Sequence, residues 1–302
     1  LPLLRGKTIG VVGNQTSVIF QSEKDYTHLV DSLLKRNISI KKVFAPEHGF
    51  RGTADAGERV EDGIDSRTGL PVISLYGDQK KPDPRHLQDL DVILFDIQDV
   101  GARFYTYIST LHYMMEACAE QGIQLIVLDR PNPNGHYIDG PVLEENYKSF
   151  VGMHPVPVVH GLTIGEYAQL INGEKWLING IQCDLKVITM EDYSASRAYD
   201  LPIKPSPNLP NAKSINLYPS LCFFEGTNVS AGRGTDLQFQ IFGSPVLDSM
   251  YFNFKFTPVS NPGAKYPKHE NKLCFGKNLQ NEKELDQLNL DWLLQAYHHT
   301  QD

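Results

Sequence analysis

The stretch Val92-Ile-Leu-Phe-Asp-Ile97 is followed at once by Gln98-Asp-Val-Gly101 and then by a long helical pattern. Its apolar residues do not alternate with polar ones. Such a run predicts a strand covered on both faces, as in a parallel sheet flanked by helices, and we expect it to be the central strand. Ligands of open α/β sheets bind beyond the carboxyl ends of the strands. We therefore expect the chemistry to lie near Asp96, Gln98 and Asp99.

Strand-like and helix-like patterns alternate on both sides of this stretch. Further short apolar runs predict strands at residues 8–12, 40–45, 72–76 and 125–128. Between them, apolar residues recur at helical spacing from Tyr26 to Leu34 and from Phe104 to Cys118, and Gly122 ends the second pattern. This alternation predicts a doubly wound parallel α/β sheet with right-handed crossovers.

The texture of the sequence changes near residue 152. Met153-His-Pro-Val-Pro157 has the composition of a linker, and four prolines crowd into residues 202–210. We therefore expect one domain over residues 1–152 and a second, smaller α+β domain over residues 153–302.

Three local patterns stand out in the second half. Thr163-Ile-Gly-Glu166 has the form of a capping box, which predicts a helix start with Glu166 on a backbone N–H group. Residues 223–236 form a polar run rich in small residues. A helical pattern at residues 291–297 lies close to the last residue, so we expect the second domain to be cut short there.

Composition and charge argue against several classes of function. The 302-residue chain is 41% hydrophobic and has a net charge of -8 without a basic block. This balance argues against nucleic acid as the main partner and provides no polybasic membrane patch. No stretch approaches the roughly 20 apolar residues of a membrane span. Because the first residue is Leu1, we expect a processed, exported protein of the periplasm or extracellular space whose signal has been removed.

Familiar cofactor and metal motifs do not occur in the sequence. No G-x-G-x-x-G follows the first predicted strand, and the phosphate-binding loop, H-E-x-x-H and G-x-S-x-G motifs do not occur either. Dinucleotide, NTPase, zinc-peptidase and α/β-hydrolase chemistry are therefore disfavoured. The widely spaced cysteines indicate neither a zinc knuckle nor a dense disulfide scaffold, and they leave one or two bridges possible: Cys118, Cys183, Cys222 and Cys274.

Glu47 is the strongest candidate for a catalytic acid. It follows a predicted buried strand and lies between Pro46, which restricts the chain, and His48-Gly49, where glycine permits a sharp turn. A carboxyl at such a dry sheet edge favours its protonated form, as a general acid working near neutral pH requires. A solvated loop glutamate is the alternative interpretation and carries about equal weight.

Other carboxylates also lie in loops. Asp96, Asp99 and Asp129 follow predicted strands, and we expect one or two of them to hold loops by accepting backbone N–H groups. Glu225 and Asp236 are the candidates of the second domain.

Basic side chains beside these loops predict an anionic ligand group. A carboxylate gripped bidentately is the simplest such group, and the arginines in position to bind it are Arg51, Arg103, Arg130 and Arg233. Each of them is also a candidate for an ordinary salt bridge. His48 and His160 can donate to a sugar or a phosphate, and a structural contact is an equally good interpretation of His160, which precedes Gly161.

Seven loop motifs, in their order along the chain, resemble those of the NamZ-type exo-β-N-acetylmuramidases. They span nearly the whole sequence, at residues 14–17, 45–52, 95–105, 128–135, 160–166, 205–210 and 224–235. Among them are Ala45-Pro-Glu-His-Gly-Phe-Arg-Gly52 and Leu128-Asp-Arg-Pro-Asn-Pro-Asn-Gly135. The resemblance implies a Rossmann-like domain joined to a smaller α/β domain, with the active site in the cleft between them.

The resemblance also implies an activity and a set of site residues. The expected reaction is hydrolysis of terminal N-acetylmuramic acid from the non-reducing ends of peptidoglycan fragments, which are MurNAc-GlcNAc saccharides, with no cofactor and no metal. Glu47 matches the glutamate proposed as catalytic in the family, and Glu225 is our choice for the second carboxylate. The expected substrate-binding residues are His48, Arg51, Gln98, Asp99, Arg103, Tyr105, Arg130, Asn132, His160, Asn228 and Arg233.

The residues themselves leave two other functions open. A non-catalytic cell-wall sugar-binding protein would keep its affinity without Glu47 and would show no turnover. An esterase or amidase would act on other bonds of the same polymer. The glycosidase fits the residues better, because N-acetylmuramic acid carries a lactyl carboxylate for the loop arginines and hydrolysis by two carboxylates needs no cofactor.

Overall fold

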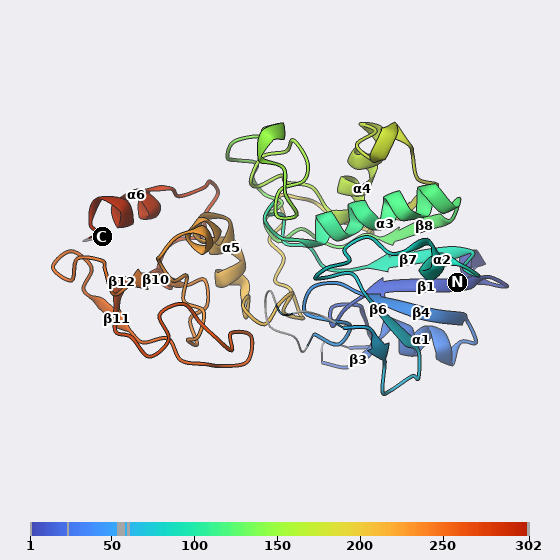
Figure 1. Ribbon diagram of the computed structural model, residues 1–302, viewed down its shortest axis with the longest axis horizontal. Helices are drawn as coiled ribbons and strands as arrows, with labels where there is room; N and C mark the ends of the chain where they lie inside the picture. The colour runs from blue at the N-terminus through green and yellow to red at the C-terminus, as the bar shows by residue number, and fades with distance from the viewer. Residues whose placement is uncertain (1, 23, 53–57, 59–60, 301–302) are drawn as a thin grey trace.

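The computed structural model describes residues 2–22, 24–52, 58 and 61–300. A larger domain, at the right in Figure 1, carries a seven-stranded sheet in the order β5-β6-β4-β1-β7-β8-β9. All neighbouring strands are parallel except the β5–β6 pair. The strands are β1 (Thr8–Gly13), β4 (Ser39–Ala45), β5 (Gly63–Ile64), β6 (Pro71–Ser74), β7 (Val92–Asp96), β8 (Gln124–Leu128) and β9 (Leu185–Ile188).

Helices cover both faces of this sheet. α1 (Leu29–Lys35) packs on one face, and α3 (Tyr107–Gln121), the longest helix, packs on the other. α2 (Pro84–Leu87) and α4 (Ile164–Gly173) join α3 on its side. The doubly wound α/β architecture expected from the alternating patterns is therefore confirmed.

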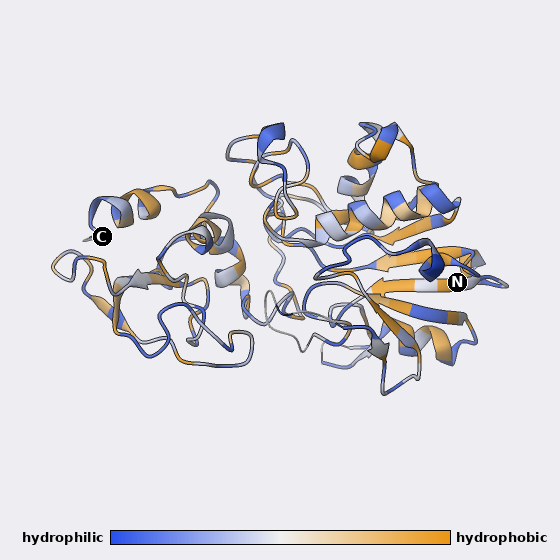
Figure 2. Cartoon of the chain, in the orientation of Figure 1, coloured by the Kyte–Doolittle hydropathy of each residue, from blue (hydrophilic) through white to orange (hydrophobic). Residues whose placement is uncertain are grey.

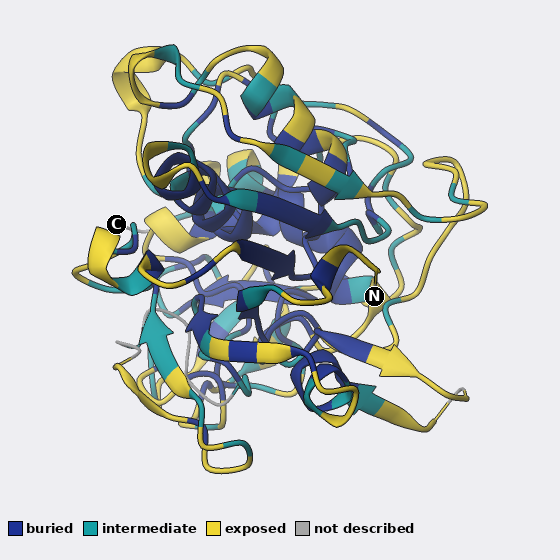
Figure 3. Cartoon of the chain, turned by 90° about the vertical axis from the view of Figure 1, so that its right-hand side faces the viewer, coloured by how far each residue is buried: buried dark blue, intermediate teal, exposed yellow. Residues whose placement is uncertain are grey.

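The side chains on the two faces of strand β7 belong to two separate hydrophobic cores. Val92 and Leu94 join the core beneath α1, whereas Ile93 and Phe95 join the larger core beneath α3. Every residue of β7 is buried, and the inner strands β1, β7 and β8 form the apolar and buried centre of the domain in Figures 2 and 3. The predicted double burial is confirmed. The central position itself belongs to β1, because three strands lie on each side of it and β7 is its neighbour.

The carboxyl ends of the parallel strands face the smaller domain, as the arrowheads in Figure 1 show. β1 is followed in sequence by β4 on one side and later by β7 on its other side, so the strand order reverses at β1. Such a reversal opens a crevice beyond the strand ends. Glu47, Gln98 and Asn132 follow β4, β7 and β8 respectively, so all three lie at this same edge, as predicted.

The larger domain continues well past the boundary expected near residue 152. α4 packs against β8 and β9, and β9 itself pairs in parallel with β8. Segment 153–159 resembles a linker in composition, yet Val158 and Val159 are fully buried and the N–H of Arg103 donates to the carbonyl of Val158 at 2.8 Å. The prolines mark an extended buried segment of the larger domain, so dividing the chain into 1–152 and 153–302 cuts through the sheet domain.

The smaller domain, at the left in Figure 1, is built around a three-stranded antiparallel sheet in the order β10-β12-β11. Its elements are α5 (Ala212–Leu221), the 3₁₀ helix η4 (Cys222–Gly226), β10 (Ile241–Ser244), β11 (Phe254–Phe256), β12 (Cys274–Asn278) and α6 (Asp291–His298). The expected smaller α+β domain is thus present, and α6 coincides with the predicted helix at 291–297.

Other local expectations can be compared with the structure. The capping box is confirmed, because Thr163 accepts from the N–H of Glu166 and the Glu166 side chain accepts from the N–H of Thr163. The helix expected from Tyr26 begins only at Leu29, since Tyr26 lies in a hairpin of β2 (Val18–Phe20) and β3 (Tyr26–His28).

The remaining short elements are η1 (Pro2–Leu4), η2 (Glu145–Tyr147) and η3 (Ile178–Gly180). The four cysteines, all within the described residues, are buried free thiols, so the bridges left open by the sequence are not formed. No helix in the described part of the chain is long and apolar enough to cross a membrane.

The loops after β7 and β8 are locked together by a close approach at Gly101. Gly101 has φ 76°, and a Cβ atom placed there would lie 2.2 Å from Oδ1 of Asn132. That oxygen already accepts from the N–H of Asn134 at 2.9 Å, and Nδ2 of Asn132 donates to the carbonyl of Leu162 at 2.9 Å. The Asn132 side chain therefore cannot move away from Gly101 without losing these hydrogen bonds.

Substituting alanine for Gly101 should destabilise the fold more than the same change at Gly122. Both glycines have positive φ, but a Cβ at Gly122, which ends α3, meets nothing within 4 Å. Gly122→Ala should cost about 1–2 kcal/mol from backbone strain alone, and Gly101→Ala should cost roughly 1–3 kcal/mol more from overpacking. Urea unfolding of both variants measures the difference, and equal losses would show that the two loops are not locked at this point.

Candidate active site

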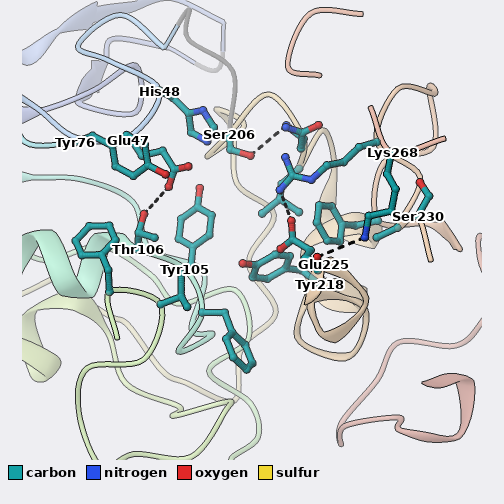
Figure 4. A pocket seen from close by; sticks show the side chains of 18 of the residues that line it. Glu47, His48, Tyr76, Tyr105, Thr106, Ser206, Tyr218, Glu225, Ser230 and Lys268 are labelled. Carbon is teal, nitrogen blue, oxygen red and sulfur yellow. Dashed lines mark hydrogen bonds and ion pairs between the residues drawn. The ribbon is translucent and has the colours of Figure 1, made fainter. Parts of the chain in front are cut away.

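Glu47 lies in a tight turn directly after β4. The N–H of Gly49 donates to the carbonyl of Pro46 at 3.0 Å, which closes the turn, and His48 at its third position has φ 70°. Glycine normally takes this left-handed conformation, so packing must hold His48 in it, and only 5% of the His48 surface is exposed. The turn directs Glu47 away from the sheet into the space beyond the strand ends (Figure 4).

Two hydroxyl groups hold the carboxyl of Glu47. Thr106 Oγ1 donates to Glu47 Oε2 at 2.7 Å, and Thr106 is the N-cap residue of α3. This bond therefore ties the turn after β4 to the first turn of the longest helix. Burial raises the pKa of Tyr76, and the charge of the neighbouring Glu47 and a hydrogen bond to it raise that pKa further. Tyr76 consequently stays a neutral donor beside the carboxyl.

Glu47 faces a cavity of about 490 Å³ between the two domains. This volume falls in the range of roughly 300–1,000 Å³ that is usual for ligand pockets. The larger domain lines it with Glu47, His48, Tyr76, Tyr105, Thr106 and Phe150, and the segment joining the domains adds Ser206 and Asn208. The smaller domain adds Tyr218, Glu225, Ser230, Arg233, Phe239 and Lys268.

An ion pair forms the wall opposite Glu47 (Figure 4). Arg233 Nη2 donates to Glu225 Oε1 at 2.5 Å, and Arg233 Cζ lies 5.3 Å from the ring centroid of Phe239. Nε of Arg233 is buried and finds no hydrogen-bond partner among the described residues.

Lys268 fastens the loop that carries Glu225. Its ammonium donates to the carbonyls of Phe224 at 3.2 Å, Val229 at 3.2 Å and Thr227. Burial lowers the pKa of Lys268, whereas the nearby carboxylate of Glu225 raises it. Since the ammonium already donates to several carbonyls, the main role of Lys268 is to hold the backbone of this wall in place.

Aromatic rings join the two walls of the cavity. The Tyr105 ring meets that of Tyr218 edge to face at 5.8 Å, and Tyr218 meets Phe239 in the same way at 5.0 Å. Tyr105 precedes α3 in the larger domain, while Tyr218 belongs to α5 in the smaller one. These edge contacts link the two walls and give the cavity an apolar side.

The structure brings together five of the residues predicted for the site: Glu47, His48, Tyr105, Glu225 and Arg233. They come from both domains and from both halves of the sequence. The other predicted residues lie outside this cavity, and most of them have partners within the protein.

Three of the four predicted arginines are occupied elsewhere. Arg51 pairs with Asp65 at 2.8 Å, and Arg130 pairs with Asp96 at 2.6 Å. The side chain of Arg103 donates to two backbone carbonyls of the larger domain. All three hold loops in place, so the prediction that they bind a ligand is not supported by their positions.

The amide residues at the strand ends also hold loops. Nε2 of Gln98 donates to the carbonyl of Pro131 at 2.6 Å, which links the loops after β7 and β8, and Asn132 makes the contacts described above. Asp129 accepts from the N–H of Gly165 and from Thr163 at the start of α4, as expected for a carboxylate that secures a loop. Asn228 is exposed and lines a separate hollow that includes residues of α6.

Asp99 and His160 form a buried pair beneath the strand ends. Oδ2 of Asp99 accepts from the N–H of Gly101 at 2.7 Å, and His160 Nε2 lies 3.7 Å from the same oxygen. Burial raises the pKa of Asp99 to about 7, and burial together with the nearby Arg103 lowers that of His160 to about 3. Within the described residues, no group of three or more His, Cys, Asp or Glu side chains could hold a metal ion.

Several cavity residues were not predicted from the sequence. Thr106 follows directly on one quoted motif, and Ser206 and Asn208 lie inside another, so proximity to a motif was the available signal. Tyr76 ends a predicted strand at the expected edge of the sheet. Lys268 lies far from every motif, and no sequence pattern indicated it.

Comparisons with known proteins agree with this arrangement. Residues 9–213 match the family described as exo-beta-N-acetylmuramidase NamZ, N-terminal, and residues 216–301 match its C-terminal counterpart. The division near residue 215 falls within α5, where the smaller domain begins. The peptidoglycan beta-N-acetylmuramidase NamZ of Bacillus subtilis is 43% identical, over 91% of this chain and 68% of that protein.

Two crystal structures of DUF1343 family proteins from Bacteroides fragilis share the fold. One is 47% identical with a TM-score of 0.89, covering 99% of this chain and 80% of the other. The second is 30% identical with a TM-score of 0.80, covering 100% of this chain and 83% of the other. The matches span both domains and both walls of the cavity, and the chain therefore belongs to the family of the exo-β-N-acetylmuramidase NamZ.

Proposed function

We propose that this chain is an exo-β-N-acetylmuramidase that releases terminal N-acetylmuramic acid from the non-reducing ends of peptidoglycan fragments, with Glu47 as the general acid. The observation that supports this most strongly is the position of Glu47. In a chain of the NamZ family, its carboxyl is held by Thr106 at 2.7 Å and faces a cavity whose far wall presents a second carboxylate.

Glu47 would supply the proton that the leaving group needs. An alkoxide of a sugar is too basic to depart unassisted, so the Glu47 carboxyl donates its proton to the glycosidic oxygen as the bond to the anomeric carbon breaks. Water supplies the hydroxyl group that ends on the anomeric carbon, and its remaining proton restores the acid. The hydroxyls of Thr106 and Tyr76 keep the carboxyl oriented towards the cavity.

Glu225 is our proposal for the second carboxylate. Positive charge develops on the anomeric carbon in the transition state of glycoside hydrolysis, and the second carboxylate either attacks that carbon or activates a water. Arg233 holds Glu225 at 2.5 Å and fixes its position on the wall opposite Glu47. The two carboxyl groups therefore have different partners, a hydroxyl group of Thr106 for Glu47 and the guanidinium of Arg233 for Glu225.

Arg233 is also the proposed contact for the lactyl carboxylate of N-acetylmuramic acid. Of the four predicted arginines, it is the one that lines the cavity. A guanidinium can serve Glu225 through one nitrogen and a substrate carboxylate through another, because it offers five N–H donors.

The proposed substrate also indicates where the protein acts. Peptidoglycan lies outside the cytoplasmic membrane, so we propose that the protein acts in the periplasm or the extracellular space.

Incubating the parent protein with a MurNAc-GlcNAc disaccharide tests the basic activity, and we expect free N-acetylmuramic acid as a product. Binding without turnover would favour the sugar-binding alternative, and release of only amide- or ester-linked groups would favour the other hydrolase.

Glu47→Gln should bind the disaccharide as the parent does and turn it over about 10²- to 10⁴-fold more slowly, because the amide cannot donate the proton. Glu174→Gln is a matched control, since Glu174 is exposed at the end of α4 and outside the cavity. Steady-state kinetics and calorimetric binding on the same preparations measure both quantities. Near-parental turnover of Glu47→Gln would remove Glu47 from the mechanism.

Arg233→Gln should lower the preference for N-acetylmuramic acid over N-acetylglucosamine at the non-reducing end. Losing a charge-assisted contact to the lactyl group should reduce the ratio of the two kcat/KM values roughly 10- to 100-fold, corresponding to about 1.5–3 kcal/mol. The ratio is the readout, because any displacement of Glu225 slows both sugars alike. Arg197→Gln, at an exposed arginine of the larger domain, is the control. An unchanged ratio would mean that another group reads the lactyl carboxylate.

A further inference from the structure

A second cavity, of about 730 Å³, adjoins the cavity of Glu47. Phe150 lines both, so the two hollows meet at this ring. The second cavity lies on α3 and extends to the end of α4, where Tyr113 and Trp176 line it. Its volume is again that of a ligand pocket, and none of the residues assigned to the proposed reaction lies within it.

A row of aromatic rings leads from the first cavity to the second. The ring of Tyr76, beside Glu47, lies 6.1 Å from Phe150, and Phe150 lies 6.3 Å from Tyr113 with an interplanar angle of 14°. Aromatic side chains bury large flat surfaces and keep specific relative geometry. The apolar faces of pyranose rings pack well on aromatic side chains, so the row favours a saccharide as the ligand.

Positive charge gathers around the second cavity although the chain as a whole has a net charge of -8. Lys80, Lys148 and Lys175 line it together with a single acidic residue, Glu145, which pairs with Lys148 at 3.0 Å. The ammonium of Lys80 lies 4.5 Å above the centroid of Phe150, at the junction of the two cavities. The surplus of lysines favours an anionic ligand.

The buried histidines beneath the second cavity do not add to this charge. His154 bonds to His112 at 2.9 Å and to the hydroxyl of Tyr167 at 3.1 Å. Burial, followed by the neighbouring positive groups, lowers the pKa of His154 to about 3, and burial also lowers that of His112. Both rings are therefore neutral near pH 7 and form a hydrogen-bonded floor, and the charge comes from the lysines.

We propose that the second cavity binds a carboxylate-bearing unit of the glycan that extends beyond the scissile bond. The inference rests on the proposed function, which places the terminal N-acetylmuramic acid at Glu47. The neutral sugar that follows would cross Phe150, and the next N-acetylmuramic acid would bring its carboxylates to Lys80 and Lys175. These carboxylates can belong to the lactyl group or to a stem peptide attached to it, since both offer the same charge.

The double variant Lys80→Gln/Lys175→Gln tests this assignment with substrates of two lengths. On a MurNAc-GlcNAc disaccharide, its kcat/KM should stay within about twofold of the parent. On the tetrasaccharide MurNAc-GlcNAc-MurNAc-GlcNAc, the loss should be on the order of 10-fold, as for two partly exposed ion pairs. Lys272→Gln/Lys283→Gln is the control, because it removes the same charge from exposed positions of the smaller domain.

Two further tetrasaccharides identify the carboxylate. One carries a stem peptide on the internal N-acetylmuramic acid, and the other has N-acetylglucosamine at that internal position and so lacks the carboxylate. A selective loss on the bare or on the peptide-bearing glycan assigns the lactyl group or the peptide respectively. An equal loss on the neutral glycan would overturn the inference, as would an equal loss on the disaccharide or no loss on any tetrasaccharide.

The two proposals fail in different ways in this experiment. Turnover of the disaccharide by the parent supports the proposed function regardless of what the lysine variant does. If the parent turns over none of the saccharides, the proposed function fails, and calorimetric binding of the tetrasaccharides then decides the second cavity. Weaker binding of only the carboxylate-bearing glycans by Lys80→Gln/Lys175→Gln would support it, and unchanged binding would overturn it.

Discussion

Burial of the inner strands on both faces is the constraint on which the rest of the structure depends. β7 sends Val92 and Leu94 into one core and Ile93 and Phe95 into the other, so neither face offers water to a polar group. Polar side chains must therefore gather where the strands end. Because the carboxyl ends face the smaller domain (Figure 1), the loops that carry Glu47 and Thr106 meet a second wall instead of open solvent.

Local patterns in the sequence predicted those parts of the structure that local forces determine. The apolar run at 92–97 is a buried strand, and the Thr163–Glu166 capping box opens α4. Glu47 lies beyond the carboxyl end of β4, as its position after the predicted strand indicated. The domain boundary was wrong because composition alone does not distinguish a proline-rich linker from a buried extended segment such as 153–159.

The partners of charged residues could not be predicted in the same way. Arg51 and Arg130 lie beside the expected loops, but Asp65 and Asp96 bind them, and these pairs form only when distant segments pack together. Arg233 lies in a similar sequence setting, yet it reaches the cavity. Whether an arginine reaches the cavity depends on tertiary structure. The same holds for Lys268, which lines the cavity although no motif indicated it. Residues next to a motif, such as Thr106, could have been predicted from the sequence.

The central claim of the proposed mechanism is that Glu47 protonates the leaving group. The most direct measurement compares Glu47→Gln with the parent on two β-linked N-acetylmuramic acid substrates, one with a sugar leaving group and one with a dinitrophenolate, which departs without a proton. A large loss of kcat on the sugar substrate and little loss on the aryl substrate is the predicted result, since only the first needs an acid. Equal losses on both substrates would contradict the assignment of Glu47 as the general acid.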